Sequence, residues 1–120
     1  MNAEKFEDVL RTRLRLTEKT LEQKSDEYAR GDMLNNIKRA ADLLQCTPER
    51  ALIGFVSKHI VALTVFVNDL EEGKEQSLDR WNEKLGDTIN YMILLEALVI
   101  ERKHPEQGCT DEARMPLGAN

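Results

Sequence analysis

Hydrophobic residues recur at steps of three and four along the first quarter of the chain. Between residues 3 and 29 they fall on one side of a helix, while charged residues fill the remaining positions. This spacing predicts an amphipathic helix with a single buried stripe. Gly31 follows as a C-terminal cap, because glycine adopts the left-handed backbone conformation without strain. The stripe consists of Phe6, Val9, Leu10, Leu14, Thr17, Leu21 and Tyr28.

Two more helices are predicted between residues 33 and 70. The first covers residues 33–44 and the second residues 48–70, with Thr47 as N-cap, Pro48 at the first helical position and Glu49 facing the positive end of the helix dipole. The shorter helix is expected to bury Leu34, Ile37, Ala40, Ala41 and Leu44.

The helix over residues 48–70 is apolar on both sides, which is unusual in so small a chain. One face carries Leu52, Phe55, Val56, His59, Ile60, Leu63, Phe66 and Val67, and the other carries Ala51, Gly54, Val61, Ala62 and Val65. A helix that is hydrophobic all round is normally buried on all sides. The pattern therefore predicts a central helix or a subunit interface, and with it a homo-oligomer, either a dimer or a tetramer.

A polar loop over residues 71–76, containing Gly73, precedes a fourth helix over residues 78–103, which Ser77 caps and Pro105 ends. Its expected apolar face is Leu78, Trp81, Leu85, Ile89, Met92 and Ile93. The fold class is thus all-α: a mainly antiparallel four-helix bundle with the last two helices as its central pair. Residues 1–104 form one helical domain and residues 105–120 a flexible tail.

Charge and composition narrow the classes of partner. The formal net charge of −5 argues against binding duplex nucleic acid, which requires a basic surface. Arg11, Arg13, Arg15 and Lys19 alternate with acidic residues, so a solvated helix face is favoured over nucleic-acid contacts. The charged N-terminus does not resemble a signal peptide, and the longest apolar run, residues 60–67, is too short to cross a bilayer. A cytoplasmic protein with two reduced cysteines and no membrane partner is expected.

Candidate chemistry begins on the fourth helix. Glu83, Asp87 and Asn90 are spaced four and three residues apart and share one face. Two carboxylates and an amide suit a hard cation such as Mg²⁺, which prefers oxygen ligands. Spacing alone favours the simpler alternative, in which Glu83 pairs with Arg80 or Lys84 and Asp87 pairs locally.

Two further groups of polar residues are candidates for binding a ligand. Lys58 and His59 interrupt the apolar third helix. If Lys58 is buried, its ammonium group needs Asp87, Glu83 or a phosphate as partner. Alternatively, its long side chain reaches solvent. His59 is read as a hydrogen-bonded core histidine rather than a ligand. Around the break after the first helix, Lys24, Lys38 and Tyr28 could contact phosphate and stack on a base, or they could simply be surface groups beside a turn.

These residues also carry a family resemblance that spans about residues 24–102. The opening strings are Lys24-Ser-Asp-Glu-Tyr28-Ala and Asp32-Met-Leu-Asn-Asn36-Ile-Lys38, the middle one is Lys58-His59, and the last is Trp81-Asn-Glu83-Lys-Leu-Gly-Asp87-Thr-Ile-Asn90-Tyr91-Met-Ile-Leu-Leu. They resemble motifs of small helical proteins carried by tailed bacteriophages, which would place the chain in the host cytoplasm. That group in turn resembles the MazG and dimeric dUTPase superfamily of all-α nucleoside triphosphate pyrophosphohydrolases.

The resemblance implies a four-carboxylate Mg²⁺ site on two facing helices, yet this chain departs from it. Asp87 matches the family's aspartate, but Lys84 stands where a metal-binding glutamate is expected, and the Lys58-His59 segment with Ala62 replaces the acids of the other helix. Exchange of carboxylates for lysine and histidine weakens Mg²⁺ binding and favours direct contact with phosphate.

Three functions stay open at this stage. The expected one is binding of a nucleotide or nucleotide-derived phosphorylated ligand without hydrolysis, for sequestration or sensing and with no cofactor. The second is Mg²⁺-dependent pyrophosphohydrolysis, with Glu83 and Asp87 as metal ligands. The third is a structural or adaptor module. The binding residues expected for the first are Lys24, Tyr28, Asn36, Lys38, Lys58, His59, Asn90 and Tyr91.

Overall fold

The computed structural model describes residues 1–27 and 34–104, with the side chains of residues 25–27 excepted. Its four helices are α1 (Ala3–Glu27), α2 (Asn35–Leu44), α3 (Pro48–Glu71) and α4 (Leu78–Lys103), and the described residues contain no strand. The all-α class and the predicted order of helices are confirmed. The expectations about Tyr28, Gly31 and the tail after residue 104 concern residues outside these ranges.

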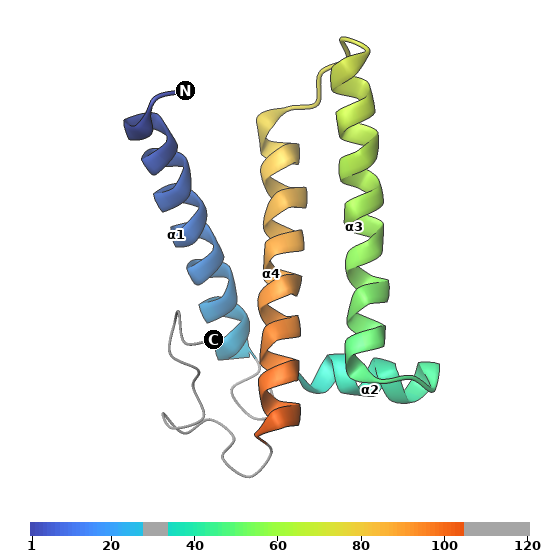
Figure 1. The fold of residues 1–120 in the computed structure, drawn as a ribbon. Helices are drawn as coiled ribbons and strands as arrows, with labels where there is room; N and C mark the ends of the chain where they lie inside the picture. Colours follow the sequence, from blue (N-terminus) through green and yellow to red (C-terminus); the bar gives the residue numbers. More distant parts are fainter. Residues whose placement is uncertain (28–33, 105–120) are drawn as a thin grey trace.

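The four helices form an open arrangement around α4 (Figure 1). Helices α3 and α4 lie side by side and run in opposite directions, and α2 crosses the end where α3 begins. Helix α1 packs on the other side of α4 and runs in the same direction as α4, so the bundle is antiparallel only in part. The central helix is α4, with α1 and α3 on either side of it, so the prediction of α3 and α4 as the central pair holds only for α4.

The predicted helix starts are confirmed in their hydrogen bonds. Thr47 Oγ1 accepts from the Arg50 amide at 3.1 Å, and Ser77 Oγ accepts from the Arg80 amide at 3.2 Å. Each bond satisfies an amide that the first helical turn leaves without a partner. Gly73, in the loop between α3 and α4, has φ of +77°, a left-handed conformation that glycine adopts without strain.

The core lies where α2, α3 and α4 meet. Leu34, Ile37, Leu52 and Leu98 form its buried cluster, against which Tyr91 and other residues of α4 pack. Leu44 was expected there but is 62% exposed, because it lies in the last turn of α2, beyond the crossing.

Contacts at both ends of α4 hold it against α3. At one end, the Phe66 and Trp81 rings meet edge to face at 5.3 Å. At the other, Arg102 donates from Nε and Nη2 to the two carboxylate oxygens of Glu49, at 2.6 and 2.7 Å. This bidentate geometry fixes the direction of approach as well as the distance.

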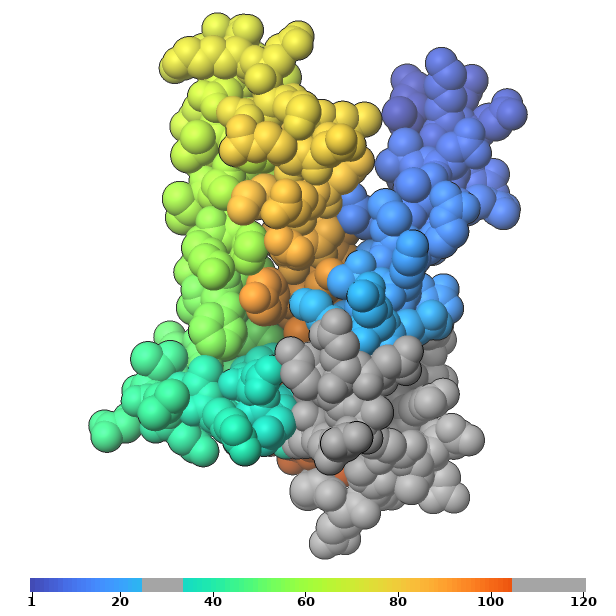
Figure 2. Space-filling view, turned by 180° about the vertical axis from the view of Figure 1, so that it is seen from behind, coloured from blue at the N-terminus to red at the C-terminus, as the bar shows by residue number. Residues whose placement is uncertain are grey.

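Much of the predicted apolar stripe of α1 is not buried in one chain. Phe6, Val9, Leu10 and Leu14 are 46–60% exposed, and only Thr17 is buried. Figure 2 shows the reason: the first half of α1 diverges from α4 and leaves a hollow between the two helices. A cavity of about 450 Å³, lined mainly by apolar side chains such as Val9, Leu16, Leu85 and Ile89, lies there. The N-terminal half of α1 therefore presents its apolar side to the surroundings.

Helix α3 is buried on one side only. Leu52, Val56 and Phe66 face the core, whereas Val61 and Val65 are 61% and 49% exposed. By length and composition alone, α3 could cross a membrane. The sequence prediction concerned uninterrupted apolar runs, of which the longest is residues 60–67, and polar residues such as Ser57 and Lys58 interrupt α3.

Candidate functional site

Three of the predicted ligand-binding residues meet at one cavity of about 240 Å³, here called the tyrosine cavity. Lys24 comes from α1, Asn36 from α2 and Tyr91 from α4, and Phe55 of α3 adds a second aromatic wall. These residues are far apart in the sequence, and they meet near the end of the bundle where α1 ends, α3 begins and α2 crosses. The cavity combines an ammonium group, an amide and two rings, which suits a ligand that is part anionic and part planar.

Tyr91 is the central side chain of this region. Its ring lies 6.4 Å from that of Phe55 and 5.4 Å from the imidazole of His59, in tilted arrangements. Burial raises the pKa of Tyr91 above its ordinary value of 10.0, and the nearby Asp87 carboxylate raises it further. The hydroxyl therefore stays neutral and able to donate a hydrogen bond throughout the physiological range.

This raised pKa predicts a specific loss of stability in alkali. Above about pH 10 the tyrosine of the unfolded chain loses its proton while folded Tyr91 keeps it, so the free energy of unfolding falls as pH rises. Tyr91→Phe removes this contribution. Between pH 9 and pH 11, the melting temperature of the wild type should therefore fall more than that of the variant. An identical pH dependence for both proteins would contradict the assignment.

The row on α4 lines a different cavity, of about 260 Å³, between α1 and α4. Glu83, Asp87 and Asn90 line it as their spacing predicted, together with Arg13 and Thr17 of α1. We call this the acidic cavity. Among the described residues no group of three or more histidine, cysteine, aspartate or glutamate side chains could hold a metal ion. The acidic cavity therefore offers a cation two carboxylates and an amide oxygen on α4, beside the hydroxyl groups of Thr17 and Thr20 on α1.

Lys58 follows the exposed alternative, and His59 is the residue that faces Asp87. Lys58 is exposed, and no ion pair joins it to Asp87 or Glu83 in the described ranges. His59 instead points its Nδ1 toward Asp87 Oδ2 at 3.8 Å, with a side chain only 11% exposed. A shift of one residue turns a helical side chain by about 100°, so the neighbour of an exposed lysine faces the partner helix.

The remaining candidates fall outside both cavities or outside the described residues. Lys38 forms an ion pair with Glu101 of α4. Tyr28 lies in the segment that the structure does not describe. Asn90 and Tyr91 are neighbours in sequence but line different cavities, as do Thr20 and Leu21 of α1. Both cavities are lined by α1 and α4, and the tyrosine cavity is also lined by α2 and α3.

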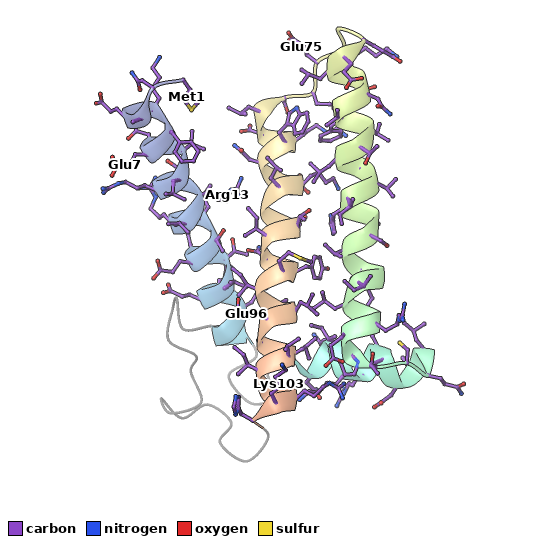
Figure 3. All side chains as sticks on the ribbon, viewed as in Figure 1. Met1, Glu7, Arg13, Glu75, Glu96 and Lys103 are labelled. Carbon is purple, nitrogen blue, oxygen red and sulfur yellow. The ribbon has the colours of Figure 1, made fainter. Side chains whose placement is uncertain are left out.

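Sequence reasoning missed two members of the acidic cavity. Arg13 points from α1 toward α4 (Figure 3), and its Nη2 donates to the Asn82 carbonyl oxygen at 3.3 Å and lies 3.4 Å from Asn82 Oδ1. Its Nη1 would lie 2.7 Å from a Cβ at Gly86, so the glycine makes room for the guanidinium. The alternation of charges on α1 gave no sign that Arg13 faces inward. Thr17 was predicted to be buried, but only as part of an apolar stripe.

Comparison of the chain with protein-family models, with curated proteins and with solved structures found no match.

Proposed function

We propose that the protein binds a nucleotide or nucleotide-derived phosphorylated ligand in the tyrosine cavity, without hydrolysing it, as a sequestering or sensing protein. One observation carries the proposal: Lys24, Asn36 and Tyr91, each selected from the sequence as ligand-binding, line a single cavity. The MazG-like ancestry, the bacteriophage origin and the cytoplasmic location suggested by the sequence motifs are parts of the same proposal.

Each wall of the cavity has a chemical role in this proposal. The Lys24 ammonium pairs with phosphate, the Asn36 amide hydrogen-bonds a polar edge of the ligand, and the Tyr91 and Phe55 rings contact the face of a base. Stacking on aromatic rings is tolerant of base identity, because every base has a π-face. The cavity accordingly supports recognition of the nucleotide class more than of one base.

The proposal excludes hydrolysis because several residues differ from the metal-binding acids of the family that the motifs resemble. In the enzymes that the motifs resemble, acids stand at the positions that Lys84, Lys58 and His59 occupy here. Ala62, about one turn further on, also stands where an acid is expected. Metal-dependent hydrolysis depends on a full set of ligands to position the ion and generate the attacking hydroxide.

The enzymatic alternative has one observation in its favour. Glu83, Asp87 and Asn90 share one cavity, so an Mg²⁺ ion held there could be approached by a triphosphate. The enzymatic alternative requires a metal ion and the binding proposal does not, and the experiments below test this difference.

Removal of the Lys24 ammonium is the direct test of the binding proposal. Lys24→Ala should weaken binding of nucleoside mono- or triphosphates about tenfold, the effect of losing one charge-assisted hydrogen bond from an exposed side chain. Binding is measured by isothermal titration calorimetry in EDTA, and affinity should fall with added salt because ionic contacts are screened.

Lys58→Ala is the matched control, since it removes an equally exposed lysine that lies outside the cavity. It should bind as the wild type does. Equal affinity for Lys24→Ala and wild type, or loss of binding in Lys58→Ala alone, would place any site away from the tyrosine cavity and reject the proposal.

We further infer that the protein self-associates through the outer face of α3. The apolar residues left exposed on this helix are Ile53, Ile60, Val61, Val65, Val67 and Leu70, each at least 42% exposed. Arg50 lies at one end of α3, and Glu71 and Glu72 lie at the other. Antiparallel pairing of two copies would bury these apolar residues and bring Arg50 of one copy toward Glu71 of the other.

A further inference from the structure

Two polar atoms buried at the acidic cavity have no hydrogen-bond partner within the part of the chain that the structure describes. Thr17 is 8% exposed and Asn90 is 6% exposed, and both line the cavity. Among the described residues neither Thr17 Oγ1 nor Asn90 Oδ1 has a hydrogen-bond partner. A buried polar atom left unpaired destabilises the fold, and native structures contain few of them. Two on facing helices at one cavity indicate that a bound molecule completes their bonding.

The charges around these atoms define what that molecule must carry. Glu83 and Asp87 supply two carboxylates, while Arg13 supplies one positive charge. The Arg13 guanidinium is directed to Asn82 and sits against Gly86, one turn from Asn90. The region around Asp87 and Asn90 therefore offers hydrogen-bond acceptors and an excess of negative charge.

We propose that the acidic cavity binds a small organic cation bearing a primary ammonium group. An ammonium has three N–H donors and no acceptor. Those donors match the Asp87 carboxylate, Asn90 Oδ1 and the Thr17 hydroxyl, which accepts as readily as it donates. The inference is independent of nucleotide binding in the tyrosine cavity.

The cavity, of about 260 Å³, has room for a short amine, since one water molecule occupies about 30 Å³ in the liquid. A four-carbon diamine such as putrescine fits this volume, with one ammonium at Asp87 and the other reaching Glu83 or solvent.

Thermal denaturation and calorimetry of the full chain with putrescine, in the absence of nucleotide, test the proposal. Putrescine should raise the melting temperature saturably, because a ligand that binds only the folded state stabilises it. Tetramethylammonium has a positive charge but no N–H donor, so it should have no comparable effect at equal concentration. Equal stabilisation by both cations, or none by putrescine, would overturn the proposal.

Two variants locate the site. Asp87→Asn should weaken putrescine binding about tenfold or more, and Thr17→Val should weaken it about fivefold, since each removes one acceptor. Valine matches the shape of threonine and removes an unpaired buried hydroxyl, so Thr17→Val should fold as stably as wild type or more so. The matched control is Thr64→Val, because the exposed Thr64 hydroxyl donates a hydrogen bond to the Ile60 carbonyl oxygen of its own helix. Unchanged affinity in Thr17→Val, or stabilisation by Mg²⁺ where putrescine has none, rejects an ammonium site here.

Discussion

Replacing Val61 or Val65 by glutamate is expected to turn a dimeric or larger protein into a folded monomer. Both side chains are about half exposed or more in the single chain, at 61% and 49%, so the charge has free access to water once the copies separate. In a dry interface between two α3 helices, an unpaired carboxylate destabilises the assembly by several kcal/mol.

Sedimentation velocity at micromolar concentration, with circular dichroism for the fold, measures this effect. The wild type should sediment as a dimer or tetramer, and both glutamate variants as monomers with unchanged helix content. Leu43→Glu is the matched control, because Leu43 is 86% exposed on α2, away from the outer face of α3. It should leave the association state unchanged.

Two results would contradict self-association through α3. One is a monomeric wild type. The other is binding of the wild type to liposomes of neutral lipid that the Val61→Glu variant loses, since α3 is long and apolar enough to enter a membrane. The second result would assign the exposed apolar face to lipid and would also remove the proposal of a cytoplasmic protein.

The helices could be predicted closely because their signals are local. Thr47 and Ser77 each accept from the amide three residues later, as expected of N-caps, and Pro48 marks the first residue of α3. These signals depend on neighbours in sequence and on no tertiary contact. The start of α2 differed by two residues, at a segment without such a cap.

Burial was harder to predict, because it depends on where each helix meets the others. On α4, Leu98 and Asn90 are buried while Leu78 of the expected apolar face is 73% exposed. The polar row that begins at Glu83 faces α1, and Leu94 and Leu98 continue it into the core. Hydrophobic periodicity could not show that α1 and α3 contact α4 from two sides, leaving part of its apolar face uncovered.

The candidate sites show the same division between local and tertiary information. The row of Glu83, Asp87 and Asn90 was predicted from helical spacing alone and lines one cavity. The meeting of Lys24 with Tyr91 depends on the path of α1 along α4, which no local signal in the sequence shows. Arg13 gave no sequence signal, since its inward direction depends on the space left by Gly86 some seventy residues later.

We expect no pyrophosphate release above background when the protein is incubated with any nucleoside triphosphate and Mg²⁺ or Mn²⁺. The reason is the ligand set at the acidic cavity, where Glu83 and Asp87 are the carboxylates and Arg13 already supplies a positive charge. In enzymes of this chemistry the metal lowers the barrier by several kcal/mol, which corresponds to orders of magnitude in rate. A coupled assay for pyrophosphate, run with wild type and Asp87→Asn, should give the same baseline for both.

Asp87→Asn also separates the three functions when nucleotide binding is measured on the same samples. The nearest cationic partner of Asp87 is His59, at 3.8 Å and charged only when protonated, so the variant should fold. Nucleotide binding that persists in EDTA with no turnover in either protein supports the binder. Robust turnover that needs Mg²⁺ or Mn²⁺ and that Asp87→Asn abolishes replaces the binder with a metal-dependent pyrophosphohydrolase. If protein that is folded and associated through α3 shows neither binding nor turnover, both the binder and the enzyme are rejected. What remains is a structural module whose polar cavities serve packing alone.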